Sequence, residues 1–336
     1  MHFGWFVLGI LTADRCFDKV KIICTYYQII LMTKLRFDGK FDGKLEMKRL
    51  QSRRNLRTLI DDPGCLTLPG VFDGVSTRLA EQSGFPGVYM TGFGAVASAL
   101  GLPDVGTASY SEMLDRVRCI AGSTSLPFLA DGDTGFGGLL NVDRTVRGYI
   151  DAGAGGIQLE DQEFPKKCGH TPGRRVIAAE DAARKIRVAV AARDSRDFLI
   201  VARTDARTGH GLEEALRRAD MFLSAGADAL FIESPETVDE MQRIGECFRG
   251  TPLVANMVEG GSTPFVSAEE LGALGFKIQL RPVTALLASA AAMRAAYREL
   301  RQIGETSQSR VPLLPFSEMT ELLGFPEVLK FEANWS

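Results

Sequence analysis

A cysteine lies within an unusual run of charged residues near the middle of the chain. The segment GIQLEDQEFPKKCGH, residues 156–170, passes from an apolar stretch into two acids, two lysines, a thiol and an imidazole. Cys168 is beside Lys166, Lys167 and His170, an electropositive setting that favours the thiolate. A glycine-containing loop of this kind can open and close over a site. The segment therefore predicts a reactive cysteine, and the alternative is an incidental loop cysteine.

A second candidate for chemistry is the segment DGDTGFGG, residues 131–138. Asp131 and Asp133 are two apart, so at a strand end one can face inward while the other turns in from the loop. The glycines of the segment free the backbone to do this. A few oxygen ligands with no histidine nearby suit Mg²⁺ or Mn²⁺ held partly through water, and do not suit zinc. Glu160 and Asp104 would complete the carboxylate set; the alternative is a metal-free Asx turn.

The elements that position these residues alternate regularly after Pro63. Eight short apolar runs read as strands: LTLPGVFD, GVYMTG, LPFLADGD, GIQLED, FLIVARTD, ALFIES, PLVANM and FKIQLRP. Segments with helical spacing lie between them, at 76–84, 110–125, 142–154, 179–195, 212–227, 238–248 and 267–275. Strands that alternate with amphipathic helices imply parallel βαβ units. Eight of them predict an α/β fold, the (β/α)₈ TIM barrel.

The structural alternative is an open doubly wound sheet, which usually has fewer strands. That fold also carries a glycine fingerprint after its first strand. The segment DGVSTR, residues 73–78, is not such a fingerprint.

Active sites of these barrels lie at the carboxyl ends of the strands. Nearly every predicted strand end carries an ionisable or amide group. These groups are Asp73, Thr91, Asp131, Asp133, Glu160, Asp161, Arg203, Asp205, Glu233, Asn256, Glu259 and Arg281. Any one of them could be a turn residue or a helix cap. Their convergence on one mouth predicts a site, because buried like charges are costly unless a cation neutralises them.

Composition narrows the class of protein further. The chain has 336 residues, 45% hydrophobic and 24% charged, with a net charge of −3. Nucleic-acid binding would require a basic surplus, so no nucleic-acid partner is expected. The six cysteines include no CxxC pair. This usage is typical of reduced intracellular thiols and predicts a cytoplasmic protein.

Residues 1–45 read as a poorly ordered extension, and residues 46–336 as one catalytic barrel with C-terminal helices. The apolar runs MHFGWFVLGIL and VKIICTYYQIILM are shorter than a membrane span and are separated by charged residues, so no membrane partner is expected. Met32 and Met47 are alternative starts, and organelle targeting by the extension stays open. A first helix is expected at about EMKRLQSRRNLRTLI.

Several motifs together resemble the isocitrate lyase and phosphoenolpyruvate mutase superfamily, from about Leu59 to the C-terminus. They are KKCGH after LEDQ, DGDTGFGG, GLPDVG, VARTDA and ANMVEGGSTP. The resemblance implies a (β/α)₈ barrel whose last helix is exchanged between subunits, a homotetramer built as a dimer of dimers, and Mg²⁺. In the lyases of this family the loop cysteine is the general acid that protonates an enolate-like carbanion after C–C cleavage.

The resemblance also implies a role for each candidate residue. Backbone amides that bind the substrate carboxylate belong to Thr91, Gly92 and Phe93. The ligands of Mg²⁺ and its waters are Asp131 and Asp133, supported by Asp104 and Glu160. The loop supplies the acid Cys168, with Lys167, Gly169 for close approach and His170 to tune the thiol. The remaining pocket residues are Arg203, which grips a carboxylate, and Glu233, Asn256 and Glu259.

Three departures bear on the substrate. Thr91 replaces the usual serine, which resembles the branch that handles oxaloacetate and alkylmalates. Phe316 stands where methylisocitrate lyases place a carboxylate-gripping arginine, and losing such a cation should cost about 2–5 kcal/mol. Arg281 stands where the family has an aromatic or aliphatic residue. It either compensates for the missing arginine or pairs with a pocket acid.

The sequence therefore predicts a Mg²⁺-dependent carbon–carbon lyase or hydrolase acting on a small C4-to-C6 dicarboxylate, such as oxaloacetate or a 2-alkylmalate. The nearest alternative is a 2-methylisocitrate lyase. Phosphonate chemistry at a P–C bond, as in phosphoenolpyruvate mutase, is an alternative from another reaction class, and it needs no protonating thiol. A non-catalytic barrel is the remaining alternative.

Overall fold

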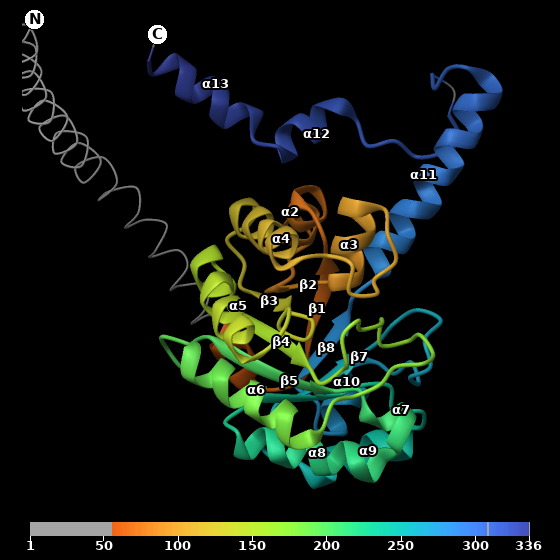
Figure 1. Cartoon of the computed structure of the whole chain (residues 1–336). Coiled ribbons are helices and arrows are strands. Elements are labelled where there is room, and N and C mark those ends of the chain that lie inside the picture. Colours follow the sequence, from red (N-terminus) through yellow and green to blue (C-terminus); the bar gives the residue numbers. More distant parts are fainter. Residues whose placement is uncertain (1–55, 308, 336) are drawn as a thin grey trace, which may run out of the picture. The chain divides into compact units, whose positions relative to one another are not determined.

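The computed structural model describes residues 56–307 and 309–335. Its central feature is a closed barrel in which each parallel strand pairs with the next and β8 pairs with β1 (Figure 1). The strands are β1 (Leu66–Val71), β2 (Val88–Met90), β3 (Phe128–Asp131), β4 (Gly156–Glu160), β5 (Leu199–Thr204), β6 (Ala229–Ile232), β7 (Leu253–Asn256) and β8 (Ile278–Arg281). The predicted (β/α)₈ barrel is confirmed, and the open sheet is excluded.

Helices follow the strands in sequence, and all seven predicted helical segments are present. They are α2 (Gly74–Gln82), α4 (Tyr110–Ser123), α5 (Leu139–Ala152), α6 (Ala179–Ala192), α8 (Leu212–Ser224), α9 (Val238–Cys247) and α10 (Ala268–Ala273). Two further helices begin directly at strand ends, α3 (Gly92–Leu100) and α7 (Ala206–His210). Thr91, Gly92 and Phe93, whose backbone amides are expected to bind a carboxylate, are therefore the cap and the first turn of a helix.

Capping side chains fix where the helices begin. The Asp73 carboxylate accepts a hydrogen bond from the backbone of Ser76 at 2.7 Å and completes a capping box at the start of α2. Ser109 and Glu112 form the same motif at α4. Such caps pair backbone N–H groups that a helix start leaves unsatisfied. Asp73, one of the acids at the strand ends, is thus a cap.

Two apolar clusters follow from the alternation of side chains along the strands. One fills the barrel interior and contains Leu68, Leu129, Val201 and Phe231. The other lies between strands and helices and includes Met90. Successive side chains of a strand point to opposite faces, so membership of one cluster or the other shows whether a strand residue faces the barrel interior or the helices.

Among the described residues before β1, a short helical segment packs into the barrel. Residues 56–61 are helical, and Leu56 and Ile60 are buried in the interior cluster. This segment overlaps the last residues of the predicted first helix, whose earlier residues lie outside the described part of the chain. The predicted extension, residues 1–45, lies outside the described residues. Among the helices that the structure describes, none is long and apolar enough to cross a membrane.

The C-terminal helices are unusually exposed. They are α11 (Thr284–Ile303), α12 (Phe316–Leu322) and α13 (Phe325–Ala333), and none of their described residues is buried. Large apolar side chains on them are exposed, among them Tyr297, Phe316, Leu329 and Phe331. Contiguous exposed apolar surface of this kind marks an interaction site in a soluble protein.

Candidate active site

Inward-facing side chains at the carboxyl ends of the strands form one polar layer. The alternation that points Leu129 and Val201 into the barrel also points inward the residues two positions later. The layer consists of Thr91, Asp131, Glu160, Arg203, Glu233 and Asn256. It borders a cavity of about 240 Å³ at the barrel mouth. Barrel enzymes place their active sites at this end.

Most of the predicted site residues line this cavity. They are Thr91, Phe93, Asp104, Asp131, Glu160, Lys167, Cys168, Gly169, His170, Arg203, Asn256 and Glu259. The other three touch lining residues: Gly92 lies against Asp131, Asp133 pairs with Lys166, and Glu233 pairs with Arg203. The structure therefore brings the predicted site together.

Asp104 and Asp133 share a buried lysine. The Lys166 ammonium lies 2.5 Å from Asp104 Oδ1 and 2.6 Å from Asp133 Oδ1, and all three side chains are buried. Burial alone would lower the pKa of Lys166, but Asp133, Glu160 and Asp104 together raise it well above its usual range. Lys166 therefore remains charged and neutralises part of this carboxylate cluster.

Both lysines of the cysteine loop line the cavity, but their side chains lie in different settings. Lys167, the predicted catalytic lysine, has an exposed side chain whose ammonium donates to the carbonyl of Pro172 at 3.4 Å. Its backbone N–H and carbonyl both bond the amide of Gln162, which fixes the loop. Lys166 carries the buried charge. A run of two lysines gives no sequence signal for which one turns inward, because the loop path decides it.

Asp131 lies at the end of β3 and faces the cavity, and Asp133 follows it in the loop. Asp133 has a φ of +47°, in the left-handed region, and its backbone N–H donates to Asp131 Oδ1 at 3.0 Å. Tyr149 of α5 donates to the carbonyl of Asp131 at 3.0 Å. Gln158 donates to Asp131 Oδ1 at 3.4 Å and accepts from Tyr89. The backbone N–H of Asp133 and Gln158 orient the Asp131 carboxylate, and Tyr149 fixes its backbone. The contacts of Gln158 and Tyr149 join separate elements and therefore leave no signal in the sequence.

The carboxylates of this segment are buried and close enough to repel one another. Burial raises the pKa of Asp131, and the neighbouring Asp133 raises it further. Burial also raises the pKa of Asp133, although Lys166 opposes the shift. The pKa of Glu160 is raised well above its usual range by burial, although Arg203 opposes it. The cluster is therefore short of positive charge.

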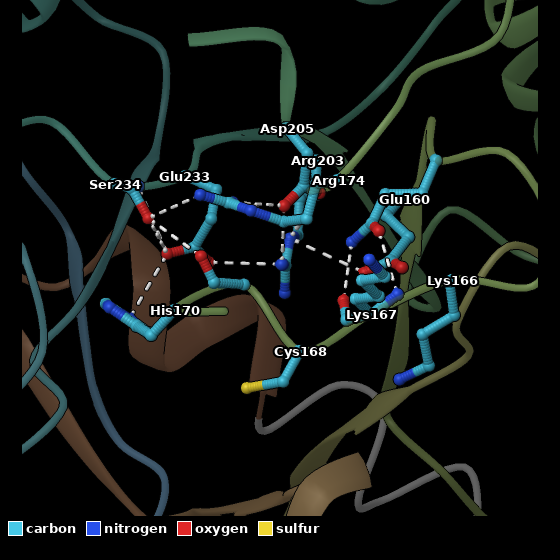
Figure 2. A network of polar contacts seen from close by, with 12 residues as sticks. Glu160, Lys166, Lys167, Cys168, His170, Arg174, Arg203, Asp205, Glu233 and Ser234 are labelled. Atoms are coloured by element: carbon cyan, nitrogen blue, oxygen red, sulfur yellow. Dashed lines mark hydrogen bonds and ion pairs between the residues drawn. The ribbon is translucent and has the colours of Figure 1, made fainter. Parts of the chain in front are cut away.

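Arg203 is at the centre of a second buried network (Figure 2). Its Nε and Nη2 donate to Asp205 at 2.9 Å each, and Nη2 lies 3.4 Å from Glu233 Oε2. Glu160 Oε2 is 3.5 Å from Nε. Burial alone would lower the pKa of Arg203, but Asp205 and Glu233 raise it well above its usual range. The guanidinium is permanently charged and held rigid by a bidentate pair.

The loop after β4 closes over this network. Gly169 packs so tightly that an added Cβ would overlap Arg203 Nη2 and lie 2.8 Å from Glu233 Cδ. His170 accepts at Nδ1 from the backbone N–H of Ser262 at 3.3 Å. Its Nε2 lies 3.3 Å from Glu233 Oε1, so the proton of the neutral ring is on Nε2 and faces that carboxylate. Burial lowers the pKa of His170, which keeps the ring neutral.

The setting of Cys168 differs from the prediction. Burial raises the pKa of its thiol, and Asp104 adds to the shift. The charge expected from the lysines is not available, because Lys166 is paired with two carboxylates and Lys167 is exposed. Burial and the missing lysine charge therefore favour the thiol form of Cys168 over the expected thiolate.

Two of the three departures that bear on the substrate, Arg281 and Phe316, are not among the described residues that line the cavity, whereas Thr91 is. Arg281 stacks its guanidinium over the Phe265 ring at 3.9 Å from the centroid, and it is not among the described residues lining the cavity. Its described contact is with this ring rather than with an acid of the cavity. Phe316 begins α12 with 82% of its surface exposed and is likewise not among the described lining residues.

The donor set is compatible with a divalent cation. Glu160 Oε1 is buried with no hydrogen-bond partner among the described residues, and the same is true of one Glu259 oxygen. Across residues 56–307 and 309–335, no three acidic, histidine or cysteine side chains form a ready-made ligand cage. Mg²⁺ retains several waters and often takes only one or two carboxylates. Asp131 and Asp133 satisfy that smaller requirement.

Comparison with known proteins agrees with this geometry. The family model for phosphoenolpyruvate phosphomutase matches residues 56–302. The chain belongs to this family. It is 42% identical over 287 residues to the 2,3-dimethylmalate lyase of Eubacterium barkeri, covering 85% of this chain and 99% of the relative. It is 39% identical to a 2-methylisocitrate lyase of Aeropyrum pernix, covering 84% and 90%.

Solved structures place the chain in the same superfamily. Oxaloacetate acetylhydrolase in complex with the inhibitor 3,3-difluorooxalacetate matches with a TM-score of 0.81 and 33% identity, covering 85% of this chain and 97% of that one. Phosphonopyruvate hydrolase, solved with oxalate and Mg²⁺, matches with a TM-score of 0.76 and 32% identity, covering 84% and 98%. The predicted superfamily is confirmed, and the relatives at 39–42% identity described above are named lyases.

Proposed function

We propose that this protein is a Mg²⁺-dependent lyase that cleaves a carbon–carbon bond in a small dicarboxylate, with Cys168 as general acid. The observation that carries the proposal is the half-buried Cys168 thiol on the same cavity as the Arg203 guanidinium and the Asp131 carboxylate. Cleavage next to a carboxylate requires a cation to bind the anionic product and a proton for the carbon left behind.

The start of α3 supplies a site for one substrate carboxylate. Thr91 caps this helix by accepting from the backbone N–H of Gly94 at 3.3 Å, which directs the first turn toward the cavity. The N–H groups of Gly92 and Phe93 belong to that first turn, whose donors the helix itself leaves unsatisfied. Helix N-termini bind anions through such donors and the helix dipole.

Asp131 and Asp133 would hold Mg²⁺, with Asp104 and Glu160 in support. The bound cation would polarise an oxygen of the substrate and relieve the repulsion within the carboxylate cluster. Lys166 keeps Asp104 and Asp133 together and limits the net negative charge. Gln158 and Tyr149 fix Asp131, so its carboxylate needs little reorganisation on binding.

On the cavity, Cys168 would donate the proton and Arg203 would stabilise the negative charge. For a 2-alkylmalate, the 2-hydroxyl gives its proton to a carboxylate on the cavity, such as Glu160, and becomes the oxo group as the bond between the 2-carbon and the 3-carbon breaks. The electron pair of that bond stays on the 3-carbon, next to the second carboxylate. For oxaloacetate, water first adds to the 2-oxo group, and the resulting hydrate loses a hydroxyl proton in the same way. The Cys168 S–H donates the proton to the 3-carbon. Arg203 stabilises negative charge on the 2-oxo product, because its guanidinium is charged and already oriented by Asp205.

The cavity wall favours a dicarboxylate over a tricarboxylate. Phe93, Val258, Val283 and Leu287 give one side of the cavity an apolar lining. Arg281 is stacked on Phe265 and supplies no cation there. A third carboxylate against this wall would be buried without a partner, whereas an alkyl group or hydrogen would be accepted. This supports oxaloacetate or a 2-alkylmalate, with 2-methylisocitrate as the alternative.

We also propose that the chain forms a homotetramer, a dimer of dimers, with the last helix exchanged between subunits. The exposed apolar side chains of α11, α12 and α13 support this, because a neighbouring subunit would cover them. A cytoplasmic location remains a proposal from cysteine usage.

The test is turnover of a substrate panel by the purified protein with Mg²⁺. The panel contains oxaloacetate, 2,3-dimethylmalate, 2-methylisocitrate, isocitrate and phosphonopyruvate. We expect kcat/KM for oxaloacetate or the alkylmalate to exceed that for 2-methylisocitrate by at least roughly 30-fold, the equivalent of about 2 kcal/mol. Preferred cleavage of phosphonopyruvate would assign the protein to P–C chemistry. Mg²⁺ binding without turnover of any compound would favour a non-catalytic barrel.

A further inference from the structure

Ser234 has a strained backbone directly after the pocket residue Glu233. Its φ is +58°, in the left-handed region that favours glycine. The residue is 2% exposed, so the conformation is enclosed by its surroundings. Strained backbones of this kind persist only where the structure enforces them, and they cluster at functional sites.

The contacts of Ser234 join strand β6 to the cysteine loop. Its hydroxyl donates to the carbonyl of Gly169 at 3.0 Å and lies 3.2 Å from Glu233 Oε1. Its backbone N–H already donates to the same Glu233 oxygen at 3.1 Å, so the hydroxyl proton is free to serve the loop carbonyl. Arg174, four residues beyond His170, donates to the hydroxyl at 3.4 Å (Figure 2).

We infer that Ser234 is a positioning residue that holds the loop Cys168–Gly169–His170 closed over the cavity. Its left-handed backbone aims the hydroxyl at the loop while the N–H holds Glu233. A residue in the extended conformation would not direct both groups this way. The inference rests on the proposed function for its effect on turnover, but the anchoring of the loop is measurable without any substrate.

Two substitutions separate the hydroxyl from the backbone strain. Ser234→Ala removes the hydroxyl and keeps a side chain in the strained conformation. Ser234→Gly removes the hydroxyl and also relieves the strain. Ser123→Ala is the matched control, because the Ser123 hydroxyl also donates to a backbone carbonyl, that of Cys119, but on the outer helix α4.

The readout is the rate at which iodoacetamide alkylates Cys168, followed by mass spectrometry of the peptide that contains it. Cys247 is exposed and serves as the internal reference. Loss of one buried hydrogen bond should raise the fraction of molecules whose cysteine loop is open by about fivefold to tenfold. We expect Cys168 to react faster by about this factor in both Ser234 variants, with Cys247 and the Ser123→Ala protein unchanged.

Other outcomes would overturn the inference or locate the error elsewhere. Unchanged alkylation of Cys168 in both variants would show that the hydroxyl does not hold the loop. Faster alkylation in Ser234→Ala but not in Ser234→Gly would assign the effect to strain and reject the anchor. Faster alkylation in both with unchanged kcat and KM for the preferred substrate would retain the anchor and reject the proposed role of Cys168.

Discussion

Gly169→Ala should disable the site while leaving the barrel intact. A Cβ at residue 169 would overlap Arg203 Nη2 and lie 2.8 Å from Glu233 Cδ and 2.9 Å from Glu233 Oε2. Neither neighbour can yield easily, because Arg203 is held by Asp205 and Glu233 is bonded by Ser234. The loop would have to lift instead, which moves Cys168 away from the cavity.

The size of the effect follows from the overlap. Forcing an extra methyl group into a well-packed site costs about 1–3 kcal/mol. If that cost falls on the closed loop alone, kcat/KM drops about 5-fold to 150-fold. The melting temperature should change little, because the open loop relieves the clash without disturbing the strands. Steady-state kinetics with the preferred dicarboxylate and a thermal melt measure the two quantities.

Gly209→Ala is the control for this experiment. Gly209 belongs to α7, which follows β5, and an added Cβ there meets no described atom within 4 Å. Its kinetics should match those of the unmodified protein. If kcat/KM is undiminished in Gly169→Ala, the claim that the enzyme is active only with the cysteine loop closed is refuted.

Three further predictions test other parts of the account. EDTA should abolish activity and Mg²⁺ or Mn²⁺ restore it, and Asp133→Ala should weaken Mn²⁺ binding measured by paramagnetic resonance; full activity in a metal-stripped sample would contradict this. Because burial raises the pKa of Cys168, its thiol stays protonated to a higher pH than an ordinary thiol. We therefore expect kcat to fall only above the pH at which an ordinary thiol ionises. A kcat that falls at lower pH would contradict the role of Cys168 as the acid. Deletion of residues 1–46 should leave fold and rate nearly unchanged, since Leu56 and Ile60 are retained; an insoluble or inactive product would show that the extension is structural.

Much of the fold and the site could be predicted because both depend on local alternation. The period of two along each strand places Asp131 and Arg203 inward once Leu129 and Val201 are recognised as interior. The order of the strands then follows from the βαβ pattern, which brings the strand ends together. Residues at those ends are neighbours in space whatever their separation in sequence.

The parts that could not be predicted depend on loop paths and on contacts between elements. Lys166 and Lys167 are adjacent, and only the path of the loop buries the first between Asp104 and Asp133. The left-handed backbone of Ser234 has no sequence signal, because serine rarely adopts it. Helix α3 was missed because its glycines are poor helix formers, and packing against the barrel overrides that preference.

The most direct test of the central claim is the kcat of Cys168→Ala with the preferred dicarboxylate, measured alongside Cys168→Ser. A general acid contributes about 10²- to 10⁴-fold to the rate. We predict that kcat falls by at least about 100-fold in Cys168→Ala, with the affinity for Mn²⁺ unchanged because the thiol is not a ligand. Cys168→Ser should recover little, since a hydroxyl is a much weaker acid than a thiol. An undiminished kcat in Cys168→Ala would contradict the assignment of Cys168 as the proton donor.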